Sequence, residues 1–479
     1  MQRNIQLILV CGAFLVGAVL AASQAPGAAA KPVAQTKPIA AMSTTADTKS
    51  AAAPKPLHFP IEQHKLENGL RVVLSVDHSA PVFGLAVTYD VGSRNERPGR
   101  TGFAHLFEHM MFQGSENVGK GEHMILVLNN GGGVNGTTNE DRTNYFETLP
   151  ANQLDLGLYL EADRLRALSV NQANLENQRN AVQEERRLGI DNQPYGATEE
   201  ALSDVLYDNF AYKHSVIGSM ADLDAASVDD VKDFFRLYYA PNNAVLVLVG
   251  DFQPAVALEK IKKYFGGIAS QPTPARPDLS EPPQTGERHR RMDDTFAQTP
   301  RLDVLYKVSP GARPDWFAVE TLSAILGDGL SARLYQRLVK EKQLAVNVET
   351  DLENRPGPSP FQIQVSLRPG GDFAAVEQIV QEEIERIQKE PPAAWELEKV
   401  RLTSRRRRAE RLRSSLARAV SMGDLTAKFG DPNLINTYET SLDKVSAADV
   451  QHAAQKYLNA NQRCIIETYP KQAAAGGAQ

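Results

Sequence analysis

Hydrophobic runs and polar segments alternate along the chain in an order that predicts β-sheets packed with helices. Runs of β-branched and aliphatic residues predict strands, and apolar residues recurring every three or four positions predict helices. In the first half these patterns predict strands over 70–74, 83–89, the last part of 135–149 and 244–251, and helices over 102–112, 154–168, 174–188 and 254–265. Polar, glycine-containing segments separate several of these elements.

The second half of the chain repeats this order. The equivalent stretches are 85–91 with 301–308, 103–113 with 317–327, and 230–238 with 449–457. The spacing between the copies is nearly kept, because Phe317 follows Phe103 by 214 residues and Val450 follows Val231 by 219. The repeat predicts an internal duplication and an α+β fold of two homologous domains, each a mainly antiparallel sheet packed with helices.

The first 23 residues have the composition of an export signal. A short positive segment ending at Asn4 precedes an apolar run from Leu7 to Ala22, and small residues suited to cleavage surround Ser23. The run is short for a membrane span, so we expect the signal to be removed, with an uncleaved anchor as the alternative. We therefore expect a periplasmic protein with no stable membrane span after cleavage.

Two further segments have compositions that do not predict packed elements. Residues 24–56 are rich in Ala, Pro, Thr and Ser and predict a disordered tether, and residues 268–297 predict an interdomain linker. The expected domain limits are 57–267 for the first domain, 298–470 for the second, and 471–479 for a disordered tail.

Composition narrows the class of protein. The chain is 42% hydrophobic and 23% charged, which is ordinary for a globular protein, and its net charge of −6 argues against a nucleic-acid partner. Removal of the signal leaves Cys464 as the only cysteine, so no intramolecular disulfide is expected. The basic run 401–413 is interpreted as a solvated helix face, and a contact with a subunit or an acidic peptide is the alternative.

One stretch of the first half carries candidate metal chemistry. His105 and His109 are four residues apart, so on a helix both lie on one face, and Glu108 lies beside them. Two imidazoles with a nearby carboxylate are what a catalytic zinc site requires, and the order is the inverted zincin pattern His-x-x-Glu-His. The alternative is a core helix with two incidental histidines.

The repeat provides an internal comparison for this stretch. In the second copy, Val319 stands at the position of His105, Leu322 at that of Glu108 and Ser323 at that of His109. The helix is predicted in both copies, but the metal-binding residue types occur in one. This contrast favours the zinc interpretation, since packing of the helix does not require the histidines.

A third ligand is expected for a zinc site, and the predicted helix at 174–188 offers Glu184 and Glu185. The stretches 102–109 and 177–185, with 239–243 before a strand, resemble the pitrilysin/insulinase family of metallopeptidases, which includes the mitochondrial processing peptidase. The resemblance spans roughly 57–470 and implies half of a clamshell-shaped chamber.

The resemblance implies residue roles. It assigns His105, His109 and Glu185 as ligands of one Zn²⁺ per chain, with Glu184 as the alternative to Glu185, and Glu108 as the general base. A family acidic residue before the third ligand falls near Gln178, which departs from the acidic type and receives no role.

The family also binds peptide along an exposed strand beside the zinc. The matching segment consists of Asn135, Gly136, Thr137 and Thr138, which are expected to bind substrate as an added strand. A plain edge strand is the alternative. The preceding glycines, 131–133, are not followed by the Lys-Ser/Thr pair of a phosphate-binding loop.

The second half lacks groups that the family uses on its second domain. Val339 and Val346 stand where the family has an arginine and a tyrosine, and valine cannot donate a hydrogen bond to substrate. Lys340 or Arg337 is a possible replacement. The resemblance therefore implies a zinc-bearing subunit that works with a related chain carrying the arginine and tyrosine, or as a homodimer.

These observations predict an exported zinc-dependent endopeptidase subunit that cleaves small or unfolded peptides. Two alternatives stay open. One is a non-catalytic scaffold or assembly subunit of a related complex, and the other is a zinc hydrolase acting on something other than peptide.

Overall fold

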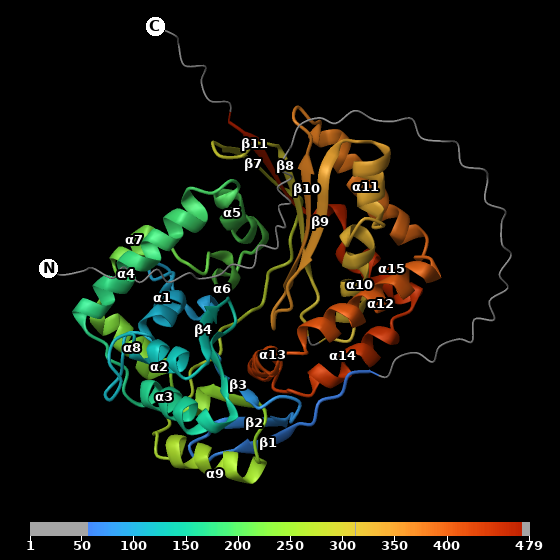
Figure 1. Cartoon of the computed structure of the whole chain (residues 1–479). Helices are drawn as coiled ribbons and strands as arrows, with labels where there is room; N and C mark the ends of the chain where they lie inside the picture. The colour runs from blue at the N-terminus through green and yellow to red at the C-terminus, as the bar shows by residue number, and fades with distance from the viewer. Residues whose placement is uncertain (1–55, 312, 472–479) are drawn as a thin grey trace, which may run out of the picture. The chain divides into compact units, whose positions relative to one another are not determined.

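Two β-sheets organise the protein, whose computed structural model describes residues 56–311 and 313–471 (Figure 1). The predicted signal (1–23), the tether up to residue 55 and the tail after residue 471 lie outside the described residues. Both sheets belong to one compact unit that begins at Lys55.

The first sheet has six strands in the order β1-β2-β6-β3-β5-β4. Its strands are β1 (Glu62–Lys65), β2 (Arg71–Val76), β3 (Val82–Tyr89), β4 (Gly133–Thr138), β5 (Thr143–Pro150) and β6 (Ala244–Gly250). All neighbouring pairs are antiparallel except β2 with β6. Strand β4 lies at the edge of the sheet, as the predicted substrate strand requires.

The second sheet has five strands in the order β7-β11-β8-β10-β9. Its strands are β7 (Arg288–Asp294), β8 (Arg301–Val308), β9 (Ala345–Leu352), β10 (Ser359–Leu367) and β11 (Cys464–Pro470). One pair of this sheet is also parallel, β7 with β11 at its edge, and the others are antiparallel. The order repeats that of β2-β6-β3-β5-β4, which confirms the predicted α+β fold and internal duplication.

Helices cover the faces of both sheets. In the first half they are α1 (Phe103–Met110), α2 (Glu122–Asn129), α3 (Leu154–Arg166), α4 (Gln172–Arg186), α5 (Gly196–Leu206), α6 (Phe210–Lys213), α7 (Met220–Asp224), α8 (Val228–Tyr238) and α9 (Pro254–Phe265). In the second half they are α10 (Trp316–Gly327), α11 (Phe373–Lys389), α12 (Ala394–Arg411), α13 (Ser415–Phe429), α14 (Leu434–Asp443) and α15 (Ala447–Tyr457). The largest hydrophobic clusters join α1, α3, α4, α8 and α9 to the first sheet, and α10, α11, α12 and α15 to the second.

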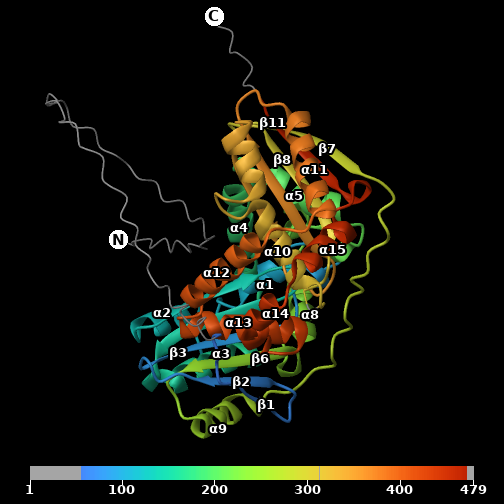
Figure 2. The same cartoon turned by 90° about the vertical axis from the view of Figure 1, so that its right-hand side faces the viewer.

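Two helices cross between the halves. Helix α13 packs on the other face of the first sheet, where Ala419 and Met422 join a buried cluster with Val245 and Val247 (Figure 2). Helix α5 packs on the second sheet, where Val205 and its neighbours join Leu305, Cys464 and Ile466. Each half therefore supplies a helix to the sheet of the other half.

Glycines let α13 approach the first sheet closely. A Cβ atom on Gly84 of β3 would lie 2.5 Å from the Cα of Leu416, and a Cβ on Gly423 of α13 would lie 2.5 Å from Oγ1 of Thr88. Both positions must lack a side chain because the backbone of one element touches the other.

The predicted linker differs from the structure in its last part. Residues 288–294 form β7, which pairs with β11 at the edge of the second sheet. Charged residues form this strand because Arg288 and Arg290 reach Asp208 and Asp204 at the C-terminal end of α5. The predicted domain limits also do not describe α5 and α13, since each belongs by packing to the opposite sheet.

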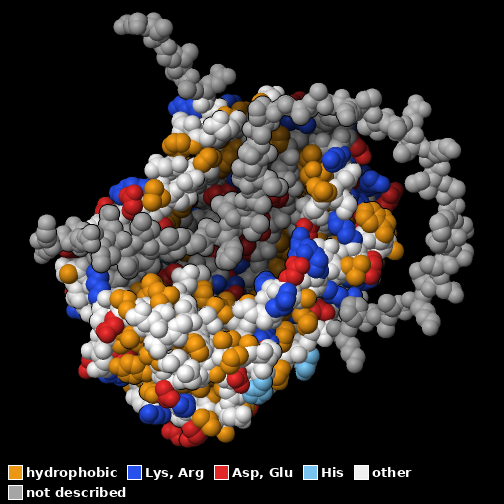
Figure 3. Space-filling model, in the orientation of Figure 1, with side chains coloured by type: hydrophobic (Ala, Val, Ile, Leu, Met, Phe, Trp, Pro, Cys, Tyr) orange, Lys and Arg blue, Asp and Glu red, His pale blue; other side chains and the backbone are white. Residues whose placement is uncertain are grey.

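The surface and the helices give further context for the predicted partners. On the face shown in Figure 3, basic and acidic side chains are intermixed. In the described part of the chain, no helix combines the length and the apolar character needed to cross a membrane. Cys464 is free and buried.

Candidate metal centre

Helix α1 is held at its start by a carboxylate from the preceding loop. Glu96 accepts hydrogen bonds from the amides of Gly102 (2.9 Å) and Ala104 (2.7 Å), and Nε2 of His214 lies 3.0 Å from the same carboxylate. Gly102 has φ = 83°, and a Cβ there would lie 2.5 Å from the carbonyl oxygen of Ile217. The first turn of α1 is therefore fixed by groups outside the helix.

Three predicted ligands lie together where α1 meets α4. The rings of His105 and His109 have centroids 4.8 Å apart on the buried helix α1. Oxygens of Glu185 lie 3.7 Å from Nε2 of His105 and 3.2 Å from Nε2 of His109. One atom from each residue lies within 4.8 Å of the others. Zinc bonds of about 2.0–2.2 Å require ligand atoms at such separations, so the three residues fit one ion.

The electrostatic surroundings favour the metal-binding protonation states of His105 and Glu185. Burial and the neighbouring His109 lower the pKa of His105 to about 4, so its imidazole is neutral at pH 7. Burial alone would raise the pKa of Glu185, but its hydrogen bond to His109 and the proximity of both imidazole rings lower it overall. Neutral imidazoles and an ionised carboxylate are the metal-binding forms.

Glu108 lies beside the three ligands and is held by strand β4. Its Oε2 accepts a hydrogen bond of 2.5 Å from the hydroxyl of Thr138. A Cβ on Gly136 would lie 3.1 Å from Cγ of Glu108, so the glycine leaves room for this side chain. Burial raises the pKa of Glu108, and the Thr138 hydrogen bond opposes the shift. A buried carboxylate with a raised pKa is suited to accepting a proton.

The predicted substrate strand thus has two kinds of residue. Gly136 and Thr138 contact or support Glu108, a role that the sequence did not predict. Asn135 and Thr137 are exposed on the same strand, and Oγ1 of Thr137 lies 2.7 Å from Oδ1 of Asn144. Arg142 bonds Thr137 and also Asp424 of α13, which ties β4 to the helix from the second half.

The other acidic candidate on α4 lies apart from the cluster. Glu184 is exposed and forms an ion pair of 3.0 Å with Arg187. Gln178 is buried, and its amide donates to Oδ1 of Asn177 at 2.7 Å. Neither belongs to the group of atoms that surrounds Glu185.

Two segments of the chain match known protein families. Residues 71–219 match the family described as Insulinase (Peptidase family M16), and residues 225–403 match the domain described as Peptidase M16 inactive domain. The chain belongs to the pitrilysin/insulinase (M16) peptidase family. The first match contains the candidate metal ligands, and the second contains α10 with Val319, Leu322 and Ser323.

Individual M16 relatives agree with this assignment. The zinc protease PqqE of Helicobacter pylori is 29% identical over 412 residues, covering 85% of this chain and 93% of the relative. A protease from Helicobacter pylori has a similar crystal structure, with a TM-score of 0.82, 28% identity, and coverage of 86% of this chain and 100% of that one. The periplasmic protease PqqL from Escherichia coli shares the fold, with a TM-score of 0.71 and 17% identity, over 89% of this chain and 49% of PqqL.

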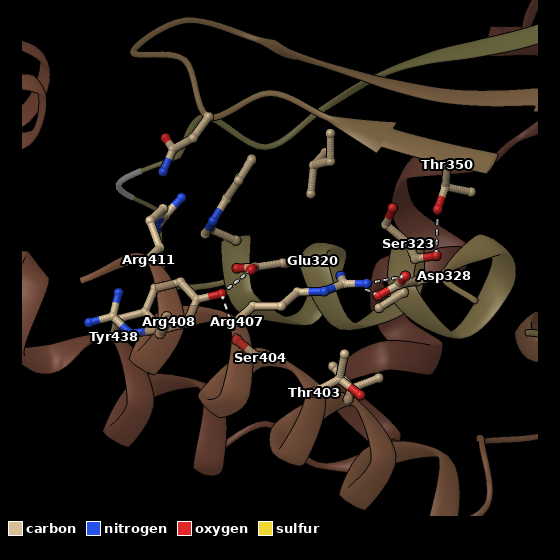
Figure 4. A pocket seen from close by; sticks show the side chains of 15 residues that line it. Glu320, Ser323, Asp328, Thr350, Thr403, Ser404, Arg407, Arg408, Arg411 and Tyr438 are labelled. Atoms are coloured by element: carbon tan, nitrogen blue, oxygen red, sulfur yellow. Dashed lines mark hydrogen bonds and ion pairs between the residues drawn. The ribbon is translucent and has the colours of Figure 1, made fainter. Parts of the chain in front are cut away.

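The second half of this M16 protein has a different cavity at the corresponding place. The cavity, of about 500 Å³, lies between α10, α12 and β9 (Figure 4). Arg407 reaches Asp328 with contacts of 2.6 and 2.8 Å, and the hydroxyl of Tyr438 bonds Glu320. Ser323, the counterpart of His109, lies at the wall of this cavity. The described side chains around it form ion pairs and hydrogen bonds where the first half has its candidate metal ligands.

Part of the basic run on α12 is internal to the fold, whereas Arg406 and Arg407 are exposed. Arg401 donates to the carbonyl oxygens of Asp443 and Val445, and Arg408 donates to that of Ile435. These arginines fasten α12 to α14 and the turn that follows it. The interpretation of this run as a solvated helix face is therefore wrong for these residues.

The positions that lack the family arginine and tyrosine lie on and before β9. Val339 packs against the second hydrophobic cluster, and Val346 is 48% exposed on β9. Arg337 pairs with Glu382 and Glu383 at 3.0 and 2.8 Å. Its guanidinium is therefore already committed to neighbouring carboxylates.

Proposed function

We propose that this M16 protein is a zinc-dependent endopeptidase. The observation that supports it most is the convergence of His105, His109 and Glu185 from two helices, with Glu108 beside them under an edge strand. When held by these residues, zinc supplies a Lewis acid that polarises a scissile carbonyl and makes a water more acidic.

Glu108 acts as the general base in this proposal. Its Oε2 is engaged by Thr138, so Oε1 is the oxygen left to take the proton of the attacking water. The same carboxyl then delivers the proton to the leaving nitrogen. Burial favours this role because a carboxylate with a raised pKa takes up a proton more readily.

Peptide binds along β4 in this proposal. The strand is at the sheet edge, so the backbone of an extended peptide adds to it as a further strand. Asn135 and Thr137 are exposed on this strand and are in position to contact such a peptide. Because binding requires an extended chain, the expected substrates are small or unfolded peptides.

The decisive experiment compares two neighbouring glutamates in the purified full chain. Glu185→Gln is expected to lose bound zinc and hydrolysis of an unstructured peptide, whereas Glu184→Gln keeps both. Metal analysis and mass spectrometry of the digest give the two readouts. A wild-type protein that binds zinc but cleaves no peptide, alone or with a related chain, would support the scaffold alternative instead.

Export and a partner subunit complete the proposal. Residues 1–23 direct the chain to the periplasm, and a related chain, or a second copy, supplies the donors that Val339 and Val346 lack. The coverage of only 49% of PqqL supports a two-part chamber. Light scattering and activity measured with and without the related chain test this point, and full activity as a monomer would contradict it.

A further inference from the structure

A second group of ionisable side chains lies under the first sheet, in its core. His123 of α2, Glu147 of β5, and Glu161 and Arg164 of α3 are all 5% exposed or less. Arg164 contacts both oxygens of Glu161, and Nε2 of His123 lies 3.2 Å from Oε2 of Glu147. Oε1 of Glu147 is buried without a hydrogen-bond partner among the described residues.

The corresponding face of the second sheet is mainly apolar. On β10, the counterpart of β5, Phe361, Ile363, Val365 and Leu367 are buried in a hydrophobic cluster, on the same face as the buried Ser359. Burying ionisable groups costs free energy unless they are paired, so packing alone does not explain the polar group in the first half.

Although His123, Glu147 and Glu161 have ligand atoms within 4.8 Å of one another, the charges balance without a metal ion. Arg164 neutralises Glu161. Burial raises the pKa of Glu147 to about 8, despite the opposing charge of Arg164, so this carboxyl is largely protonated at neutral pH. Burial and Arg164 lower the pKa of His123 to about 3, which keeps it neutral.

The guanidinium of Arg164 connects this group to the metal centre. It lies over the ring of Tyr145 at 4.4 Å and near that of Phe112, just after α1, at 5.4 Å. Tyr145 pairs with Gly136 across β4 and β5. A Cβ atom on Gly136 would lie 3.2 Å from the ring of Tyr145 and 3.1 Å from Cγ of Glu108. Gly136, the Tyr145 ring and the Glu108 side chain are therefore packed closely together.

The other end of the ring is also fixed. The hydroxyl of Tyr145 lies 3.1 Å from that of Tyr239, whose ring is 4.2 Å from that of Phe107 on α1. Tyr145 therefore forms a wall beside Glu108, with the guanidinium of Arg164 on the face of its ring.

We propose that Arg164 is a positioning residue for Glu108: held by Glu161, it fixes the ring of Tyr145 that sets where the carboxylate lies. The proposal rests on the peptidase function proposed above. Arg164 contacts none of the metal ligands, so its effect acts on the turnover step and not on zinc binding or peptide affinity.

The test measures kcat, KM and zinc content for Arg164→Lys and Arg164→Met. Lysine keeps the charge against Glu161 but loses the planar stacking, so a kcat about 3- to 10-fold lower is expected, with KM and zinc unchanged. Methionine is expected to lower kcat at least 10-fold. Arg333→Met, which breaks a paired arginine of the second half, is the matched control and is expected to leave kcat unchanged.

Unchanged kcat in the lysine variant, or loss of kcat in proportion to zinc or to folded protein, overturns the proposal. The lysine variant is expected to fold even if the methionine variant does not, because Glu161 keeps a cation. If the wild-type protein cleaves no peptide, the proposed function fails separately. In that case, crystal structures of the wild type and of Arg164→Lys decide. If the Tyr145 ring and the Glu108 carboxylate keep their positions in the variant, the inference is wrong.

Discussion

The two halves of the molecule show one scaffold with and without candidate metal ligands. Helices α1 and α10 occupy equivalent places on sheets of the same strand order, but His105 and His109 of α1 are matched by Val319 and Ser323 of α10. The valine and its neighbour Leu322 are fully buried and pack in the second core. The scaffold therefore folds without the histidines, so packing of the helix does not require them in the first half.

The largest expected effect distinguishes Glu108 from Glu320, a carboxylate on the equivalent helix α10, two residues before the Leu322 that matches Glu108. Glu108→Gln is expected to lower kcat by about 10²- to 10⁴-fold with zinc content unchanged, because the amide cannot accept the proton. Glu320→Gln, which changes a half-buried carboxylate, is expected to leave kcat within about twofold. Peptide hydrolysis and metal analysis check both, and equal losses would remove the functional difference between the halves.

The next prediction concerns the exchanged helices. Met422→Ala on α13 and Leu206→Ala on α5 each remove a fully buried side chain at the opposite sheet. Each is expected to lower the free energy of unfolding by about 2–5 kcal/mol. Urea unfolding followed by circular dichroism should keep a single transition in both variants. Two separated transitions would show that the halves unfold independently despite the exchange.

The metal-free protein is expected to lose stability as the pH falls. The pKa of His105 is about 4 in the folded chain and 6.5 in the reference state, so the unfolded chain binds the extra proton. The contribution of His105 to the free energy of unfolding is fully present above pH 6.5 and falls by about 3 kcal/mol as the pH drops towards 4.

Urea unfolding at several pH values, after zinc removal, measures this dependence. His105→Val copies the residue found at Val319 in the second half and should flatten the curve between pH 4 and 6.5. Glu147 acts in the opposite direction, because its contribution to the free energy of unfolding falls as the pH rises from 4.5 to about 8. The quantity to compare is therefore the difference between the wild type and His105→Val. Parallel curves would contradict a neutral, buried His105.

The smallest effect is expected at Ser323. Its side chain is 6% exposed at the cavity wall, and the carbonyl oxygen, not the hydroxyl, accepts the bond from Thr350. Ser323→Ala should change the free energy of unfolding by less than about 1 kcal/mol and leave hydrolysis intact. His109→Ala at the equivalent place should abolish hydrolysis, so similar outcomes for the two variants would argue against distinct roles.

Much of this arrangement follows from local sequence patterns. Hydrophobic runs predicted the central strands, and the spacing of His105 and His109 predicted a shared helix face. Helix α4 begins at Gln172, slightly before the predicted residue 174, because the side chain of Asn171 accepts the amide of Asn174. The pairing of Glu185 with both histidines depends on how α4 crosses α1, and the sequence supplied it only through the family resemblance.

The features that escaped prediction depend on contacts distant in sequence. The charged sequence of β7 is typical of a linker. The segment forms a strand because its arginines pair with acidic residues in and just after α5, about eighty residues earlier in the chain. An apolar helix face predicts burial but does not identify the sheet that covers it, so the exchange of α5 and α13 was not predicted. The link from Thr138 to Glu108 crosses 30 residues, and no local pattern marks it.

The exchange of α5 and α13 has a consequence for how the chain is made. During synthesis the far face of the first sheet, with Ala86, Val245 and Val247, stays uncovered until residue 429 has left the ribosome. No shorter product can shield that apolar surface, so a chain truncated before α13 is expected to aggregate or to occupy a chaperone. The exchange is therefore expected to make maturation all-or-none, because the first half cannot complete its packing until nearly the whole chain is available.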